Sequence, residues 1–186
     1  MLQSVCKFIL FRRLGWKLNI TVPQRDKCIL CVAPHTSNWD FIIGELFYTA
    51  LGRKAGFLMK KEWFFWPLGA LLRKMGGIPV YRSKKVSLTD QLALAARESK
   101  YFNLAVTPEG TRSRSEEWKR GFYFIALKAG IPIQLFGIDA KNKTIVCTRE
   151  ITPTGDVDAD MRSIMEYYKQ FEGLAFYPEK FAVERI

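Results

Sequence analysis

The sequence predicts an α/β fold with a mixed sheet that is parallel at its centre and flanked by helices. Short, continuous apolar runs, typical of strands buried on both faces, alternate along the chain with amphipathic helical patterns. Such alternation is typical of βαβ units and therefore of parallel strands. Two further apolar runs are separated by only three polar residues, which indicates a hairpin that adds an antiparallel part.

A single domain is expected to span residues 1–186. The chain has 48% hydrophobic and 25% charged residues, which suits one compact fold, and no repeat or linker divides it. The domain is predicted to begin with an amphipathic helix over about residues 1–18, which either packs against the fold or lies at a membrane interface. Its basic residues follow the apolar ones, the reverse of the order in a signal peptide.

The remaining elements follow from the apolar pattern. In chain order we expect a strand at 28–33, a helix at 37–52, a strand at 78–81, a helix at 87–99, a strand at 103–107, a helix at 116–129, hairpin strands at 131–140 and 144–151, and a helix at 156–172.

Local signals mark the boundaries of these elements. Ser37 and Ser87 stand where helix caps are expected, and Asp90, three residues after Ser87, completes a capping-box signature. A Gly-Gly pair precedes the second strand, and Gly130 closes the helix before the hairpin. Acidic residues occupy the first turn of the last helix, where the helix dipole favours them.

The charge of the chain is strongly positive and unevenly distributed. Lys and Arg number 29 against 18 Asp and Glu, a formal net charge of +11, and residues 53–120 hold 15 of the basic and 6 of the acidic side chains. An excess confined to one stretch indicates a face for phosphate, nucleic acid or an anionic bilayer. A solvated basic surface without a partner is the alternative.

The four cysteines do not predict a disulfide framework or a metal site. Cys28 and Cys31 form a C-x-x-C, but the chain has no second pair, and a structural zinc needs about four ligands. The cysteines lie mostly in apolar runs, where a free thiol packs as a small hydrophobe. A reducing, cytoplasmic setting fits best, and we expect no metal.

One aromatic segment, Trp63–Leu72, suggests contact with a membrane surface. No apolar run reaches the ~18 residues of a spanning helix, but a shorter segment with tryptophans and flanking cations can enter the headgroup region of an anionic bilayer. An aromatic helix buried in the core is the alternative. The contact residues are predicted to be Trp63, Phe64, Phe65 and Trp66, with the cations Lys60, Lys61, Arg73 and Lys74.

His35 is the only histidine in the chain, so imidazole chemistry would have to use it. It directly follows a predicted strand, at the edge where α/β folds usually place their active sites. Asp40, five residues later, would lie in the first turn of the next helix, where its carboxylate could orient the imidazole as a general base. A helix cap made by Ser37 and Asp40 and a loop histidine bonded to backbone are the alternatives.

Two further segments are suited to phosphate. Thr107-Pro-Glu-Gly-Thr-Arg112 would present backbone N–H groups in a turn, with a hydroxyl and a guanidinium beside them and Lys119 on the following helix. Arg82 ends a predicted strand at the same edge and would add another cation. An ordinary solvated turn is the alternative for the first of these segments.

Taken in order, four motifs resemble those of the glycerophospholipid acyltransferase family, which includes the 1-acylglycerol-3-phosphate acyltransferases. The motifs are His35-x4-Asp40, Gly77–Arg82, Pro108-Glu-Gly-Thr-Arg-Ser113 and Gly130-Ile-Pro-Ile133. H-x4-D alone is a weak signal, but its combination with E-G-T-R about seventy residues downstream is specific.

The resemblance implies a glycerol-3-phosphate acyltransferase-like fold and transfer of a fatty acyl group from acyl-CoA or acyl carrier protein to the hydroxyl of lysophosphatidate, giving phosphatidate. It implies no metal, no cofactor and no covalent acyl-enzyme. By the family's roles, His35 is the general base and Asp40 orients it. Arg82 holds the acceptor phosphate, and the remaining positions, with Lys119 beside them, shape the site: Glu109, Gly110, Thr111 and Arg112.

The sequence departs from the family pattern in two ways. Tyr81 stands where an acidic residue often precedes the arginine, so the acceptor could be another lysophospholipid or a lyso-amino-acid lipid. The chain also lacks the N-terminal spanning segments of many relatives, which implies a peripheral enzyme on the cytoplasmic side of an anionic membrane. The interpretation from a different class is a non-catalytic basic module that binds membranes or RNA; the acyltransferase interpretation expects no nucleic-acid partner.

Overall fold

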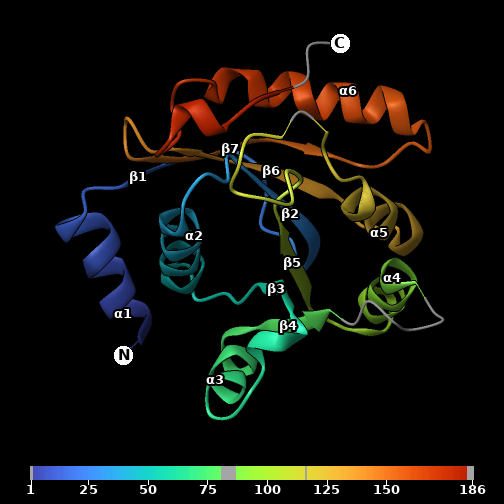
Figure 1. Ribbon diagram of the computed structural model, residues 1–186, viewed down its shortest axis with the longest axis horizontal. Helices are drawn as coiled ribbons and strands as arrows, with labels where there is room; N and C mark the ends of the chain where they lie inside the picture. Colours follow the sequence, from blue (N-terminus) through green and yellow to red (C-terminus); the bar gives the residue numbers. More distant parts are fainter. Residues whose placement is uncertain (1, 81–86, 116, 184–186) are drawn as a thin grey trace.

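A seven-stranded sheet forms the centre of the computed structural model, which describes residues 2–80, 87–115 and 117–183. The strand order is β1-β7-β6-β2-β5-β3-β4 (Figure 1). The β6–β7 pair is antiparallel and the other pairs are parallel, which confirms the predicted α/β class and the hairpin.

The bounds of the elements agree with most of the predicted ones. The strands are β1 (Lys17–Ile20), β2 (Lys27–Ala33), β3 (Gly56–Lys60), β4 (Gly77–Val80), β5 (Phe102–Val106), β6 (Ile133–Asp139) and β7 (Thr144–Ile151). The α-helices are α1 (Leu2–Lys7), α2 (Asn38–Ala50), α3 (Leu68–Met75), α4 (Leu88–Glu98), α5 (Gly121–Ala129) and α6 (Val157–Tyr168).

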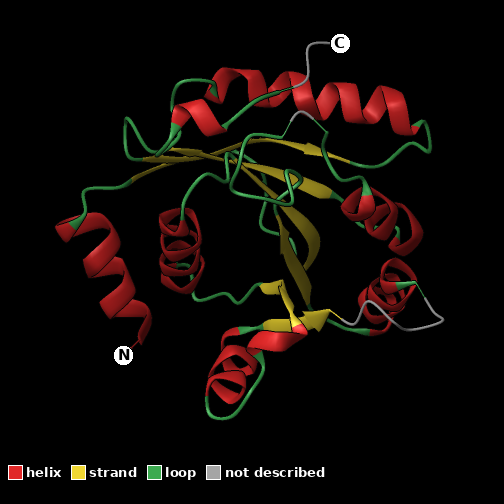
Figure 2. Cartoon of the chain, in the orientation of Figure 1, coloured by secondary structure: helices red, strands yellow, loops and turns green. Residues whose placement is uncertain are grey.

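Two apolar cores form, one on each face of the sheet. On one face α2 and the π-helical stretch after α1 (Phe8–Arg13) pack against the sheet, and on the other lie α4, α5 and α6; Figure 2 shows the strands between these helices. Alternate residues of β2 enter opposite cores, Cys28 and Leu30 on one side and Ile29 and Cys31 on the other. The continuous apolar run of β2 therefore reflects burial on both faces.

Two strands were not predicted, and the first helix is shorter than expected. β1 is an edge strand whose first three residues are exposed, so it has no apolar run to reveal it, and β3 follows directly on the loop after α2. The N-terminal helix continues from α1 through a π-helical stretch, Phe8–Arg13, and ends there rather than near residue 18, because the chain then turns into β1.

The helix predicted at 116–129 begins only at Gly121. Upstream of it, the Lys119 N–H donates to the Pro108 carbonyl (2.7 Å), which holds this stretch against the loop after β5. The capping box predicted at Ser87 is also not formed, since the Ser87 side chain makes no cap hydrogen bond. The Asp90 carboxylate instead pairs with Lys128 of α5 at 2.5 Å.

Candidate active site

His35 and Glu109 lie at one edge of the sheet because they follow adjacent parallel strands. β2 ends at Ala33 and β5 ends at Val106, and the two strands pair in parallel from Lys27 onward. Their carboxyl ends therefore meet, as expected for a site in an open α/β sheet. The Glu109 carboxylate accepts a hydrogen bond from the His35 backbone N–H (2.7 Å) and is only 2% exposed.

Asp40 both caps α2 and lies beside the imidazole. Its Oδ2 accepts hydrogen bonds from the backbone N–H groups of Thr36 (2.6 Å) and Ser37 (2.7 Å). The same oxygen lies 3.6 Å from His35 Nδ1. Ser37 completes the capping box by accepting from the Trp39 N–H (3.1 Å). Asp40 therefore caps α2 and lies beside His35 at the same time.

Burial sets the charge state of this cluster. It lowers the pKa of His35 to about 4, with the positive charge of Arg112 acting in the same direction. It raises the pKa of Asp40 to about 6, against the hydrogen bonds from Ser37 and Thr36. It raises the pKa of Glu109 to about 8, opposed by the bond from His35. At pH 7 these values leave the imidazole neutral, Asp40 largely ionised and Glu109 largely protonated.

The loop after Glu109 turns at Gly110, whose φ is +67°. A Cβ there would lie 3.2 Å from the Lys119 side chain, so Gly110 allows the stem of Lys119 to pack against the turn. The Lys119 ammonium lies 3.6 Å from the exposed Glu117 carboxylate. Thr111 and Arg112 are exposed, and Arg112 is close enough to act electrostatically on both His35 and Asp40.

Arg82 and Tyr81 fall outside the described residues, so the predicted phosphate contact has no structural description. Cys28 and Cys31 are buried free thiols in the two different cores, because residues three apart in a strand point to opposite faces. Within 2–80, 87–115 and 117–183, no three His, Cys, Asp or Glu residues are grouped to hold a metal ion.

The aromatic segment is not a single helix buried in the core. It runs from a 3₁₀ turn that ends at Trp63 into α3, and Trp63, Phe65 and Trp66 are 54%, 58% and 87% exposed. Phe64 is half-buried, and the Arg73 guanidinium lies 5.3 Å from the centre of its ring. The cations Lys60, Lys61, Arg73 and Lys74 are exposed. None of the helices in the described part of the chain is both long and apolar enough to cross a bilayer.

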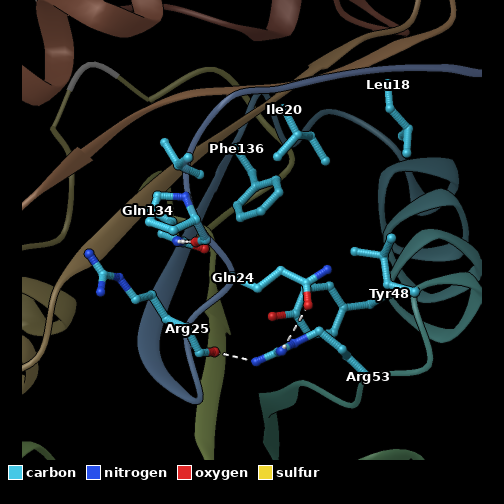
Figure 3. Close-up of a pocket in the computed structure, with 11 residues that line it drawn as sticks. Leu18, Ile20, Gln24, Arg25, Tyr48, Arg53, Gln134 and Phe136 are labelled. Carbon is cyan, nitrogen blue, oxygen red and sulfur yellow. Dashed lines mark hydrogen bonds between the residues drawn. The ribbon is translucent and has the colours of Figure 1, made fainter.

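A pocket of about 270 Å³ lies at the other end of β2 (Figure 3). Its walls come from β1, the loop before β2, the end of α2, and β6. Both of its guanidinium groups are bonded, Arg25 to Glu150 (2.7 Å) and Arg53 to Asn103 (3.2 Å) and the Arg25 carbonyl. The pocket shares no residue with the His35 cluster, and we assign it no part in the chemistry there.

Sequence reasoning missed one neighbour of the His35 loop. The backbone N–H of Tyr177, near the end of the described chain, donates to Thr36 Oγ1 (3.3 Å), directly after His35. No motif marks this segment, and the contact joins residues 141 positions apart. Only the folded arrangement of α6 and the sheet reveals it.

Comparison with known proteins identifies the family and the fold of the chain. A family model described as Acyltransferase matches residues 18–138, more than half of the chain. The crystal structure of the 1-acyl-sn-glycerophosphate (LPA) acyltransferase PlsC from Thermotoga maritima has the same fold, with a TM-score of 0.64 at 16% sequence identity over 95% of this chain and 81% of that one. No curated protein matches the sequence. The family match confirms the resemblance given by the ordered motifs: the chain belongs to the acyltransferase family.

Proposed function

We propose that the protein transfers a fatty acyl group from an acyl thioester to the free hydroxyl of lysophosphatidate, giving phosphatidate. The observation that carries the proposal is the environment of His35, a neutral imidazole beside a carboxylate at the carboxyl edge of the sheet. In the described part of the chain, no serine, threonine or cysteine side chain is hydrogen-bonded to this ring. The activated nucleophile is therefore the hydroxyl of the acceptor.

The reaction needs one base, which first takes a proton from the acceptor hydroxyl and then gives it to the leaving group. The acceptor hydroxyl gives its proton to His35 Nε2 as its oxygen attacks the thioester carbonyl carbon. The tetrahedral intermediate collapses, the carbon–sulfur bond breaks, and the leaving thiolate takes the proton from the imidazolium. The products are the acylated lipid and the free thiol of the donor, and His35 is neutral again.

The neighbouring groups support this step in different ways. Asp40, 3.6 Å from Nδ1, favours the tautomer with its proton on Nδ1, which leaves Nε2 free to accept. Glu109 holds the backbone of His35 through a 2.7 Å hydrogen bond, which joins the two loops of the site. Gly110, Thr111 and Arg112 complete the turn beside the acceptor. We assign Arg82 to its phosphate, on the family motif alone.

Peripheral contact with an anionic membrane is part of the proposal. The exposed tryptophans of the aromatic segment and the surrounding lysines and arginines suit a headgroup region, and both substrates are delivered as amphiphiles or acidic carriers. The donor is acyl-CoA or acyl carrier protein; both are acidic, and the basic excess of the chain is compatible with either.

The test is acyl transfer by purified protein in anionic micelles with each donor and a panel of lysolipid acceptors. We expect acylation of lysophosphatidate, and a loss of about 10²- to 10⁴-fold in His35→Gln, a change that keeps the side chain polar while removing the base. Circular dichroism of the variant checks that it is folded. Preference for an acceptor without a phosphate would reassign the headgroup, and activity retained within tenfold in His35→Gln would refute the role of the base.

A further inference from the structure

The C-terminal strap, Leu174–Val183, crosses the edge of the sheet that carries the candidate active site. It begins beside the end of β6, where the Leu174 carbonyl accepts hydrogen bonds from the N–H groups of Ala140 (2.8 Å) and Lys141 (3.1 Å). Ahead of it, the Phe171 ring covers Gly137 of β6 so closely that a Cβ on Gly137 would lie 1.9 Å from the ring. The start of the strap is thereby fixed to the sheet.

The strap then contacts both loops of the site. Tyr177 donates its backbone N–H to Thr36, which is 1% exposed and follows His35. Farther along, the Ala182 carbonyl accepts from the indole N–H of Trp118 (3.3 Å), which follows the Glu109 loop. The strap thus passes β6, the His35 loop and the Glu109 loop in the order in which their strands lie in the sheet.

One cation of the strap lies against Tyr177, the residue that bonds to the His35 loop, and has no carboxylate partner among the described residues. The Lys180 ammonium lies 4.2 Å from the centre of the Tyr177 ring, a cation–π contact. Lys180 is half-buried, and among the described residues no ion pair joins it to an Asp or Glu, the adjacent Glu179 included. Tyr177 is 45% exposed, so this cation is accessible from solvent.

We propose that Lys180, positioned by Tyr177, binds a phosphate group of a substrate in this reaction. The inference rests on the proposed function and adds a binding residue outside residues 18–138, the part that the family model covers. An ammonium with no carboxylate partner in the described part of the chain is a compact donor suited to phosphate oxygens. Arg112 acts electrostatically on the imidazole from the Glu109 loop, and Lys180 lies on the strap that bonds to Thr36, so two separate segments bring cations to the loops of the site. Acceptor and donor both carry phosphate, and kinetics distinguish the two sources.

The experiment compares Lys180→Met, which keeps the stem over Tyr177, with Lys180→Arg, which keeps the charge. The matched control is Lys169→Met, an exposed lysine after α6 that pairs with Glu166. We expect Lys180→Met to raise KM about tenfold or more for the substrate whose phosphate is bound, with kcat within about twofold. A raised acceptor KM assigns the lipid headgroup, and a raised donor KM assigns the donor. Lys180→Arg and Lys169→Met should stay near wild type.

Binding measurements separate this proposal from the proposed function. Calorimetric titration with sn-glycerol 3-phosphate and with coenzyme A reports phosphate binding without turnover. If wild type transfers acyl groups and Lys180→Met keeps both KM values within twofold, the Lys180 proposal fails and the function stands. If no acyl group is transferred but Lys180→Met weakens binding of one probe, the phosphate site stands and the function fails. The binding role of Lys180 would be overturned if Lys180→Arg did not restore the affinity, or if the loss of affinity accompanied a lower Tm. A wild type that binds neither probe and transfers no acyl group would overturn it as well.

Discussion

Asp40 shows how one carboxylate can cap a helix and lie beside an imidazole at the same time. Its Oδ2 binds two N–H groups at the start of α2, so its position is set by the helix and not by the histidine. Because the start of α2 fixes Asp40, the distance between its carboxylate and the imidazole depends on the position of the His35 loop. The hydrogen bond from the His35 backbone N–H to Glu109 fixes that loop.

The pH dependence of the reaction should report Asp40. Because burial raises the pKa of Asp40 to about 6, kcat/KM of the wild type should fall as the pH drops through about 6, when the orienting charge is lost. Asp40→Asn should lower kcat/KM at pH 7 by at least about tenfold and remove this acidic limb. Profiles between pH 5 and 8 measure both effects; an unchanged limb in Asp40→Asn would assign it to another group.

Glu109 should make the stability of the fold depend on pH. Its pKa in the folded state, about 8, lies above the usual value of 4.5, so its contribution to stability is complete below about pH 4.5 and is lost as the pH rises through 8. Glu109→Gln can still accept the His35 N–H bond but does not titrate. Its free energy of unfolding relative to wild type should therefore rise between pH 5 and 8, by at most about 1.4 kcal/mol per pH unit.

Denaturant unfolding at several pH values measures this difference. Glu117→Gln is the control, because Glu117 lies in the same loop but its side chain is 88% exposed. A pH-dependent rise of the same size in the control would assign the effect to the charge of the loop and not to Glu109. A flat difference for Glu109→Gln would show that Glu109 is ionised in the fold throughout.

At the scale of elements, the packing of β6 against the segment before the strap should be sensitive to a single methyl group. Gly137→Ala would place a Cβ 1.9 Å from the Phe171 ring, so either the ring or the strand must shift. We expect a loss of about 1–3 kcal/mol in unfolding free energy. Gly44→Ala, inside α2 with nothing within 4 Å of the added Cβ, should instead be neutral or stabilise by about 0.5–1 kcal/mol.

Urea unfolding of both variants measures these changes. Equal stability of the two glycine variants would contradict the close packing of Phe171 on β6. The double variant Gly137→Ala with Phe171→Leu offers a further check, since a smaller side chain should recover part of the loss.

The sequence predicted an element correctly where its local residue pattern matches its burial in the fold. β2 is buried on both faces, and its apolar run shows this directly. β1 could not be found in this way because it lies at the sheet edge with polar residues exposed. The helical pattern before Gly121 was misleading because Trp118 is buried by the Phe181 and Tyr168 rings and not by a helix face. Such contacts depend on segments that are distant in the chain.

The site likewise combines one contact that local spacing predicts with others that depend on segments distant in the chain. The proximity of Asp40 to His35 follows from five residues of spacing and a helix cap, so it could be predicted. The bond from the His35 N–H to Glu109 joins residues 74 positions apart and exists only because β2 and β5 pair in parallel. The position of Lys180 depends in addition on α6 and the strap, which carry no recognisable motif.

For the whole molecule, membrane association should depend on the aromatic segment. Trp63→Ser with Trp66→Ser removes two exposed rings, and we expect most of the sedimentation with anionic liposomes to be lost while the fold is kept. Leu94→Ser is the control, because Leu94 is an apolar residue on α4 that is about as exposed as Trp63, and this variant should sediment as wild type. Unchanged sedimentation of the tryptophan variant would shift the contact to the N-terminal helix, where Leu2, Val5 and Phe8 are exposed.

The strap also has a consequence for the biosynthesis of the protein. β1, near the start of the chain, pairs with β7, and the segment that bonds to the His35 loop lies close to the other end. Both contacts join segments that are far apart in the sequence, so neither can form until β7 and the segment after α6 have been synthesised. During translation, the edge of the sheet and the His35 loop therefore remain without these partners after β2 and α2 have already emerged.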